Sequence, residues 1–336
     1  MRKNAILKTT KYVPKHCVFT EDIRSSVGID NKRYKAVNIH KVHVAIEEDA
    51  YDMALKCAKQ LFEEFPIDKR SIKYVVYASA VNEYIIADYA MKLCRDLQLA
   101  NAETMCISQF CCGALVGLEY LDNQLKRSLD NHYGLLITSE CFHDVGINRW
   151  MAASTLYYGD GASAALIGRA SEGLIIEGGY GVTDGRFNDL WKIPVGGLKS
   201  NYIDSDEIKK AFKYEFNQNM GEKINTATLF KIMSKGSKKV VHDLLKKYGL
   251  TINDINHFIM YNPGEFMQRY LVKSIGIESS KALLETASDY GHMGSTDIIF
   301  NLDYLLDKRE VKMGEKILIF SMEAGLSFRS LLIQKS

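Results

Sequence analysis

Two adjacent cysteines, Cys111 and Cys112, stand where a strand pattern changes to a helix pattern. Residues 104–110 alternate as a short strand does, and from Gly113 onward apolar side chains recur on one face of an amphipathic helix. A thiol at this junction meets unpaired backbone N–H groups and the positive end of the helix dipole. Both features favour the thiolate, and the N–H groups can also hold an oxyanion. The pattern therefore predicts a nucleophilic cysteine, although a small buried residue would also fit this position.

Thiol catalysis needs a base beside the sulfur and a third group that orients the base. Among the eight histidines, His292 is distinctive because glycines flank it in a loop before a predicted helix. Such glycines let the backbone approach another segment closely. Asp297 falls in the first turn of that helix, from where its carboxylate can turn back to an imidazole. Cys111, His292 and Asp297 can therefore be nucleophile, base and orienting group. The alternative is an ordinary loop histidine and a carboxylate that balances the helix dipole.

The composition bounds the class of protein. The 336 residues are 47% hydrophobic and 25% charged, with a formal net charge of +2. These values are typical of a globular protein and give no sign of nucleic-acid binding. Seven cysteines without regular spacing argue against disulfides and for a reducing compartment. The basic start has no apolar core of signal-peptide length, and no stretch approaches the roughly 20 apolar residues of a membrane span. We expect a cytoplasmic protein with no metal and no nucleic-acid or membrane partner.

Apolar runs of buried-strand length alternate with helical patterns along the chain. This alternation predicts an α/β fold with mostly parallel sheets in layers with helices. The order of strand, strand–turn–helix and strand around Cys111 recurs in the second half, where His292 occupies the turn. The repeat of about 180 residues predicts a duplicated α/β unit, with halves at residues 1–170 and 171–336. Two-fold packing of the halves would bring Cys111 and His292 together.

Residues 184–226 are the least regular part of the chain. Aromatic and aliphatic side chains persist through them, so we interpret them as a cap-like excursion of the second half and not as a linker. The helices expected from the sequence, beyond the one that starts at Gly113, span residues 44–65, 84–97, 206–214, 227–248, 265–274 and 295–306.

Four segments resemble, in order, motifs of the thiolase-fold ketoacyl-acyl carrier protein synthase III family. They are Val13-Pro14, Cys111-Cys112-Gly113, Tyr158-Gly159-Asp160-Gly161-Ala162 and Met322-Glu323-Ala324-Gly325-Leu326-Ser327-Phe328. The resemblance runs from about Ala5 to Ile333 and implies a thiolase-like fold. It also implies that Cys111 is the nucleophile and that the backbone N–H groups of Cys111 and Ala324 form the oxyanion hole.

The chain departs from the condensing members of this family at two places. Those members carry a histidine in a His-Gln-Ala-Asn segment, where this chain has Tyr261 and Asn262, and an asparagine in a Gly-Asn-Thr segment, where it has His292. Their histidine and asparagine stabilise the enolate formed when a malonyl thioester loses carbon dioxide. The spacing from His292 to Asp297 instead resembles a divergent Cys-His-Asp branch that acylates oxygen, nitrogen or other acceptors, often in secondary metabolite pathways. Tyr261 and Asn262 remain candidate substrate-site residues.

The resemblance therefore implies an acyltransferase that holds its acyl group on Cys111 and passes it to a hydroxyl, amine or other small-molecule acceptor. Such an acceptor needs a general base, which His292 oriented by Asp297 supplies. The donor is a thioester of acyl carrier protein phosphopantetheine or of CoA, and no further cofactor is expected. A tryptophan-containing CoA segment of the family is missing, which favours the carrier protein. The family also implies a homodimer, paired along the sheet edge of the first half.

Two alternatives stay open. The first is a carbon–carbon condensing ketoacyl-acyl carrier protein synthase III with an altered enolate site. The second is a non-catalytic subunit of a heteromeric synthase, against which the retained cysteine argues.

Overall fold

The computed structural model describes residues 3–129, 131–142, 148–188, 198, 226–323 and 325–336. Its strands are β1 (Lys3–Tyr12), β2 (Cys17–Phe19), β3 (Lys41–His43), β4 (Ile72–Ala78), β5 (Glu103–Ile107), β6 (Tyr133–Glu140), β7 (Gly161–Ala170), β8 (Leu174–Thr183), β9 (His257–Met260), β10 (Lys316–Glu323) and β11 (Ser327–Lys335). Its α-helices are α1 (Thr20–Ile23), α2 (Asn31–Val37), α3 (Ala50–Glu64), α4 (Tyr89–Leu97), α5 (Gly113–Lys126), α7 (Thr226–Lys247), α8 (Glu265–Ile275), α9 (Glu285–Tyr290) and α10 (Asp297–Lys308). The 3-10 turns η2 (Phe110–Cys112) and η6 (Gly294–Thr296) directly precede α5 and α10.

A nine-stranded sheet runs through both halves of the chain, in the order β5-β4-β6-β7-β1-β8-β11-β10-β9. Pairing is parallel near its two ends, where β4 pairs with β5 and β6 and where β9 pairs with β10. The strands between are antiparallel, and β1 and β8 join the halves at the centre. The α/β, thiolase-like fold expected from the sequence is confirmed. The division into two copies stays a prediction.

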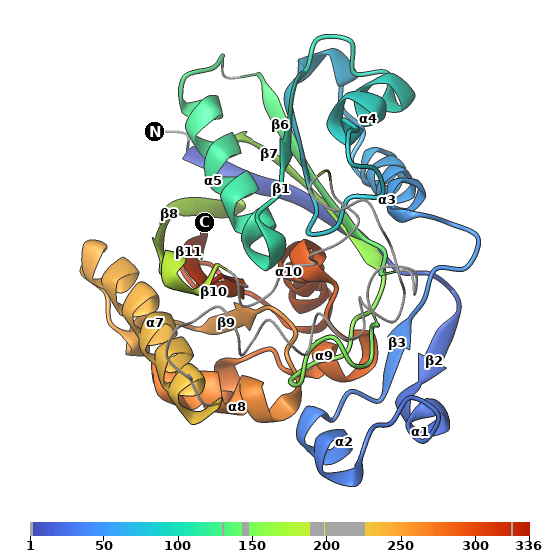
Figure 1. The fold of residues 1–336 in the computed structure, drawn as a ribbon. Coiled ribbons are helices and arrows are strands. Elements are labelled where there is room, and N and C mark those ends of the chain that lie inside the picture. Colours follow the sequence, from blue (N-terminus) through green and yellow to red (C-terminus); the bar gives the residue numbers. More distant parts are fainter. Residues whose placement is uncertain (1–2, 130, 143–147, 189–197, 199–225, 324) are drawn as a thin grey trace.

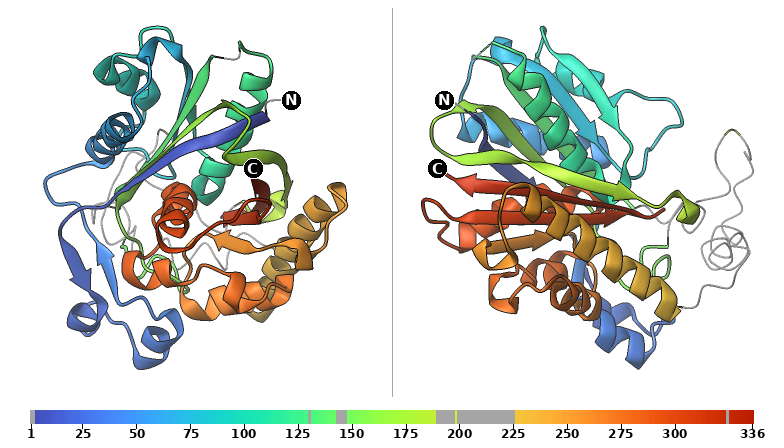
Figure 2. Two further views of the ribbon diagram at one scale, coloured as in Figure 1. Left: turned by 180° about the vertical axis from the view of Figure 1, so that it is seen from behind. Right: turned by 90° about the vertical axis from the view of Figure 1, so that its left-hand side faces the viewer.

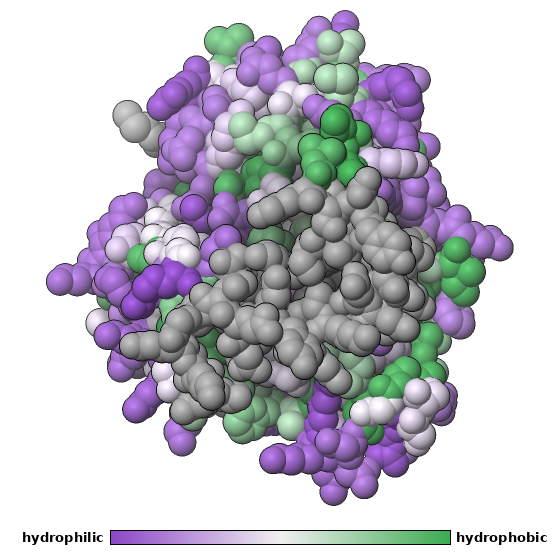
Figure 3. Space-filling model, in the orientation of Figure 1, coloured by the Kyte–Doolittle hydropathy of each residue, from purple (hydrophilic) through white to green (hydrophobic). Residues whose placement is uncertain are grey.

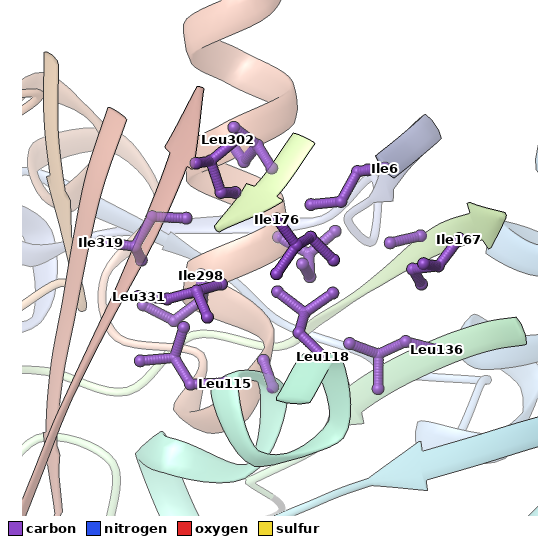
Figure 4. Packing of buried hydrophobic residues seen from close by; sticks show 14 of the residues in the cluster. Ile6, Leu115, Leu118, Leu136, Ile167, Ile176, Ile298, Leu302, Ile319 and Leu331 are labelled. Carbon is purple, nitrogen blue, oxygen red and sulfur yellow. The ribbon is translucent and has the colours of Figure 1, made fainter. Parts of the chain in front are cut away.

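Helices α5 and α10 lie beside each other at the middle of the molecule (Figure 1). Their apolar faces share one buried cluster with strands of both halves (Figure 4). Leu118 of α5, Leu302 of α10 and Ile319 of β10 are among its members, and each is 0% exposed. Burial of one such side chain contributes roughly 1.5–3 kcal/mol. The cluster therefore holds the starts of α5 and α10 in a fixed relation, and Cys111 and Asp297 lie at those starts.

Helices α3, α4, α7 and α8 cover the sheet from outside (Figure 2). Helices α3 and α4 pack with strands of the first half in one buried cluster, and α7 and α8 pack with strands of the second half in another. Because helices of both groups bury an apolar face against the sheet, the strands between them read as nearly continuous apolar runs.

Local capping moved two expected helix starts. Helix α3 begins at Ala50 instead of residue 44 because Asp49 forms a capping box with Asp52. Helix α4 begins at Tyr89 instead of residue 84 because the Asp88 side chain accepts from the backbone N–H of Met91.

Two further segments differ from the sequence-based expectation. Residues 17–43, for which no element was expected, form β2, β3, α1 and α2 at one side of the molecule (Figure 1). The helix expected at residues 206–214, and most of the expected cap-like excursion at residues 184–226, lie outside the described residues.

Replacement of Leu118 tests the central cluster. Leu118→Ala should lower the free energy of unfolding by about 2–5 kcal/mol, because a buried cavity replaces the side chain. Leu306→Ala is the matched control, since Leu306 lies on α10 but is 37% exposed, and surface changes usually stay within about 0.5 kcal/mol. Urea titration followed by circular dichroism measures both. Equal losses in the two variants would contradict this account of the core.

Candidate active site

Cys111, His292 and Asp297 form a continuous chain of contacts. The Sγ atom of Cys111 lies 3.0 Å from Nε2 of His292, and Nδ1 of His292 lies 2.5 Å from Oδ2 of Asp297. The imidazole is 2% exposed and the carboxylate 0%, whereas Cys111 is only partly buried. The structure therefore brings together the three residues that the sequence singled out, with the thiol on the accessible side. Their catalytic roles remain a prediction.

Cys111 lies on a tight turn held by β10. The strand expected to reach residue 110 ends earlier, at Ile107, and η2 intervenes before α5. Phe110 has a φ of 38°, a conformation that costs a residue with a side chain of the order of 1–3 kcal/mol. The Oγ atom of Ser321 donates to the carbonyl of Cys111 over 2.7 Å. This bond from β10 stabilises the strained turn and fixes the orientation of Cys111.

Cys112 packs beneath the same turn. Its side chain is 0% exposed, and burial, together with the nearby negative charges of Glu323 and Cys111, holds the pKa of its thiol well above the ordinary value. Cys112 therefore remains a neutral packing residue, and Cys111 is the one thiol of the pair that can react.

Close backbone approach places His292 opposite Cys111. The N–H of His292 donates to the carbonyl of Tyr157, and the N–H of Gly159 donates to the carbonyl of His292. Gly291 has a φ of 68°, and a Cβ atom there would lie 2.8 Å from the Tyr157 carbonyl oxygen. The glycine beside His292 therefore permits the close approach that the sequence predicted.

The Asp297 carboxylate is fully engaged. Its Oδ2 accepts from the backbone N–H of Asn262 as well as from His292, and its Oδ1 accepts from the backbone N–H of Met293. Because both oxygens are held, the imidazole is fixed with Nε2 towards the sulfur. This is the orientation that a base for the thiol and for an acceptor requires.

The side chain of Asn262 is hydrogen-bonded within the protein and does not line an open substrate site. Its Nδ2 donates to the carbonyl of Gly291, and its Oδ1 accepts from Thr286 and from Asn301. The side chain of this expected substrate-site residue is therefore committed to the protein scaffold behind His292 and Asp297.

Two tyrosines enclose the imidazole. The ring of Tyr261 meets His292 edge-on at a centroid distance of 5.7 Å, and the ring of Tyr158 lies 5.5 Å away. Burial raises the pKa of both phenols, so both are neutral near pH 7. Tyr261 was an expected substrate-site residue. The sequence did not single out Tyr158 for the site, although it directly precedes the Gly-Asp-Gly turn that carries the family resemblance.

The pair formed by Cys111 and His292 changes the protonation of the imidazole. Burial alone would lower the pKa of His292, but the neighbouring Cys111 sulfur and the Asp297 carboxylate outweigh burial and hold this pKa well above its ordinary value. A protonated imidazole beside sulfur stabilises the thiolate. The arrangement therefore places the imidazole directly beside the Cys111 sulfur.

Ala324, whose backbone N–H is expected to form the oxyanion hole with that of Cys111, lies outside the described residues. Within the part of the chain that the structure covers, no group of three or more His, Cys, Asp or Glu side chains could hold a metal ion. Among the helices described, none is long and apolar enough to cross a membrane.

The fold and this site together define a thiolase-like α/β protein with a Cys–His–Asp centre at the starts of two central helices. Residues 245–335 match the family model described as 3-oxoacyl-[acyl-carrier-protein (ACP)] synthase III C terminal. The beta-ketoacyl-[acyl-carrier-protein] synthase III of Clostridium tetani is 24% identical over 98% of this chain and 97% of that protein.

Solved structures agree in fold. The structure described as the acyltransferase ChlB3 is 18% identical, with a TM-score of 0.84 over 99% of this chain and 97% of that chain. The 3-oxoacyl-[acyl-carrier-protein] synthase III of Aquifex aeolicus is 19% identical, with a TM-score of 0.80 over 98% of this chain and 99% of that one. The resemblance of this chain to the ketoacyl-acyl carrier protein synthase III family is thereby confirmed.

Thiol alkylation tests the nucleophile without any substrate. At pH 6, iodoacetamide should modify Cys111 and leave Cys112 unmodified, because the His292 imidazolium stabilises only the Cys111 thiolate. His292→Ala should slow this labelling by about a hundredfold, since an ordinary thiol with a pKa of about 8.5 is less than about 1% ionised at pH 6.

Peptide mass spectrometry follows each cysteine of this experiment separately. Cys106 serves as an internal control because its side chain is exposed to reagent. Desolvation of its sulfur raises the pKa of this thiol, so Cys106 should react only as the pH rises. Equal modification of Cys111 and Cys112 at pH 6 would contradict the assignment.

Proposed function

We propose that the protein is an acyltransferase that takes an acyl group from a thioester onto Cys111 and passes it to a hydroxyl, amine or other acceptor. The observation that carries this proposal is the unbroken line of contacts from Sγ of Cys111 through the imidazole of His292 to Asp297. The donor is the phosphopantetheine thioester of an acyl carrier protein, or acyl-CoA. The reaction serves secondary metabolite or fatty-acid-related biosynthesis in the cytoplasm.

The reaction has two steps. In the first, the Cys111 thiolate attacks the thioester carbonyl, and the departing thiol takes the proton of the His292 imidazolium. In the second, His292 removes the proton of the acceptor while the acceptor oxygen or nitrogen attacks the acyl-Cys111 carbonyl, and Cys111 leaves as a thiolate. Asp297 keeps the imidazole oriented and compensates its positive charge in both steps. Positioned general bases of this kind contribute about a hundred- to ten-thousand-fold in rate.

Carbon–carbon condensation is the second candidate, since relatives of this chain carry the name beta-ketoacyl-[acyl-carrier-protein] synthase III. The site favours acyl transfer over it. Stabilising an enolate requires free hydrogen-bond donors beside the acyl-cysteine. Asn262 donates its side-chain N–H to Gly291, and Tyr261 stands where the condensing members have histidine. The imidazole at residue 292 is instead paired with a carboxylate, as a general base is.

We also propose that the protein acts as a homodimer. Strand β5 is the last strand at one end of the sheet, and an unpaired strand edge favours pairing with another chain. Tyr84, Ile85 and Ile86 lie between β4 and α4 and are 67%, 64% and 88% exposed. The described surface on the face shown in Figure 3 is largely hydrophilic. Three consecutive exposed apolar side chains beside an open sheet edge therefore support a contact surface.

His292 variants test the division between loading and transfer. His292→Ala should slow transfer about a hundred- to ten-thousand-fold more than loading at pH 8.5, where a thiol ionises without help but an alcohol does not. Asp297→Asn should act in the same direction as His292→Ala, slowing transfer more than loading, because the imidazole loses its orientation.

Acyl thioesters of N-acetylcysteamine, which reproduces the end of the phosphopantetheine arm, serve as donors in this experiment. Intact-protein mass spectrometry follows loading, and decay of acyl-Cys111 with added alcohols or amines follows transfer. Malonyl thioester is assayed in parallel, and release of carbon dioxide by the unmodified protein would overturn the acyltransferase proposal. Absence of any acyl uptake would instead indicate a non-catalytic subunit.

Substitution in the exposed apolar segment tests the dimer. Ile86→Arg should shift the protein from a dimer to the 38.0 kDa single chain at micromolar concentration, because a desolvated charge opposes association. Met313→Arg is the matched control, since Met313 is 69% exposed but lies in the turn before β10. Sedimentation velocity measures both. A single-chain species for the unmodified protein would contradict the proposal.

A further inference from the structure

Glu140, the last residue of β6, is a 0% exposed acidic side chain that takes no part in the reaction described above. Its Oε1 accepts from the backbone N–H groups of Ala80 at 2.6 Å and Ser295 at 3.1 Å. Its Oε2 lies 3.3 Å from the backbone nitrogen of Val81 and 3.2 Å from Oγ of Ser79. One carboxyl group thus joins the segment after β4 to the η6 turn, which belongs to the other half of the chain.

Ser295 connects this carboxyl group to the catalytic geometry. Its Oγ lies 2.8 Å from Oε1 of Glu140 and 2.9 Å from the carbonyl oxygen of Ala78. A Cβ atom on Gly113 would lie 3.3 Å from the Cβ of Ser295, so the turn packs directly on the start of α5. Ser295 is two residues before Asp297, and Gly113 is two residues after Cys111. The segments that carry the two ends of the Cys–His–Asp chain, Cys111 and Asp297, therefore contact each other here.

The backbone beside Ser295 is shaped around the carboxyl group. Gly294 has a φ of 55°, and a Cβ atom there would lie 2.6 Å from Oε1 of Glu140. The carboxyl oxygen occupies the space that any other residue at position 294 would need. The turn and Glu140 are thus fitted to each other at van der Waals contact.

Two serine hydroxyl groups that neighbour Glu140 each have a second hydrogen-bond acceptor. The hydroxyl of Ser295 lies between Glu140 and the Ala78 carbonyl, and that of Ser79 lies between Glu140 and the Val81 carbonyl. Each hydroxyl has one hydrogen and can donate to only one of its two neighbours. A neutral Glu140 can itself donate to one hydroxyl, which frees that hydroxyl for its carbonyl. In agreement, burial outweighs the donated bonds and raises the pKa of Glu140 to about 7.

We propose that Glu140 is a positioning residue: through Ser295 it holds the η6 turn against the start of α5 and thereby sets the distance from His292 to Cys111. The carboxyl group contacts neither Cys111 nor His292 in the hydrogen bonds above, so its effect passes through the backbone of residues 294–297. The proposal rests on the proposed acyl transfer only for its significance, because reactivity of Cys111 can be measured without substrate.

The experiment compares Glu140→Gln, Glu140→Asp and Glu140→Ala by the pH dependence of Cys111 alkylation. Asp and Ala should slow labelling at pH 6 at least about tenfold, since displacing a reacting group by about 1 Å costs up to a hundredfold. They should also move the labelling profile to higher pH, because a displaced imidazolium no longer stabilises the thiolate. Gln should retain the profile, since its amide oxygen accepts from Ala80 and Ser295 and its N–H donates to Ser79. Only the long 3.3 Å contact with the backbone nitrogen of Val81 is lost.

Glu83→Ala is the matched control. Glu83 lies on the same segment and accepts from the backbone N–H of Ala50 and from Tyr89, away from the η6 turn. Its loss should leave the Cys111 profile unchanged. Burial raises the pKa of Tyr77 and of Tyr158 above their ordinary values, so both phenols stay neutral. Burial also raises the pKa of Glu323, near Cys112, to about 7, and this group is the same in every variant. Near-ultraviolet circular dichroism confirms that each variant is folded.

Ser295→Ala provides a second route if Glu140→Ala does not fold. It removes only the hydroxyl that joins Glu140 to Ala78, and it should move the Cys111 profile in the same direction as Glu140→Ala. An unchanged profile in folded Glu140→Ala, or in Ser295→Ala when the first does not fold, would overturn the proposal. An equal shift in Glu83→Ala would overturn it as well. A shifted profile in a protein that transfers no acyl group would support the positioning role while removing the proposed function.

Discussion

The contact between the Cys111 sulfur and the His292 imidazole depends on two segments far apart in sequence meeting inside the protein. An imidazolium and a carboxylate taken out of water lose hydration that their mutual attraction alone replaces poorly. The protein compensates with further hydrogen bonds. Asp297 accepts from Nδ1 of His292, and three donors in all converge on the two oxygens of Asp297. The imidazole can be buried because both oxygens of the carboxylate behind it are hydrogen-bonded.

The hydrogen-bond network extends beyond Cys111, His292 and Asp297. Asn262 holds Asp297 with its backbone and is itself held by Thr286 and Asn301. A polar network of this kind is rigid because loss of one member leaves a buried partner unpaired. The Asn262 side chain is thus engaged in holding the segment that carries His292. The same residues therefore explain why a Cys–His–Asp centre can exist here, and they support the acyl transfer proposed above.

The packing of the central helices α5 and α10 fixes the spacing of the segments that carry Cys111 and Asp297. Their packing is apolar and non-directional, which fixes how far apart α5 and α10 lie but not how the turns before them are oriented. Orientation comes from directional hydrogen bonds at those turns, donated by Ser321 to Cys111 on one side and by Ser295 to Glu140 on the other. The strain at Phe110 and the left-handed glycines around His292 persist because these bonds hold the turns in place.

The sequence by itself determined the α/β class, most of the elements and the identity of the three residues at the centre. Apolar periodicity and glycine placement are short-range signals, so the strand before Cys111, the helix at Gly113 and the close approach at Gly291 could be predicted from neighbouring residues. Tertiary structure alone decided the rest. Asn262 could be assigned to the scaffold only when Thr286 and Asn301 were seen beside it. Glu140 resembles the end of an ordinary buried strand until Ser295 meets it from 155 residues away. A buried polar group is defined by its partners, and these partners lie on segments whose proximity only the folded chain creates.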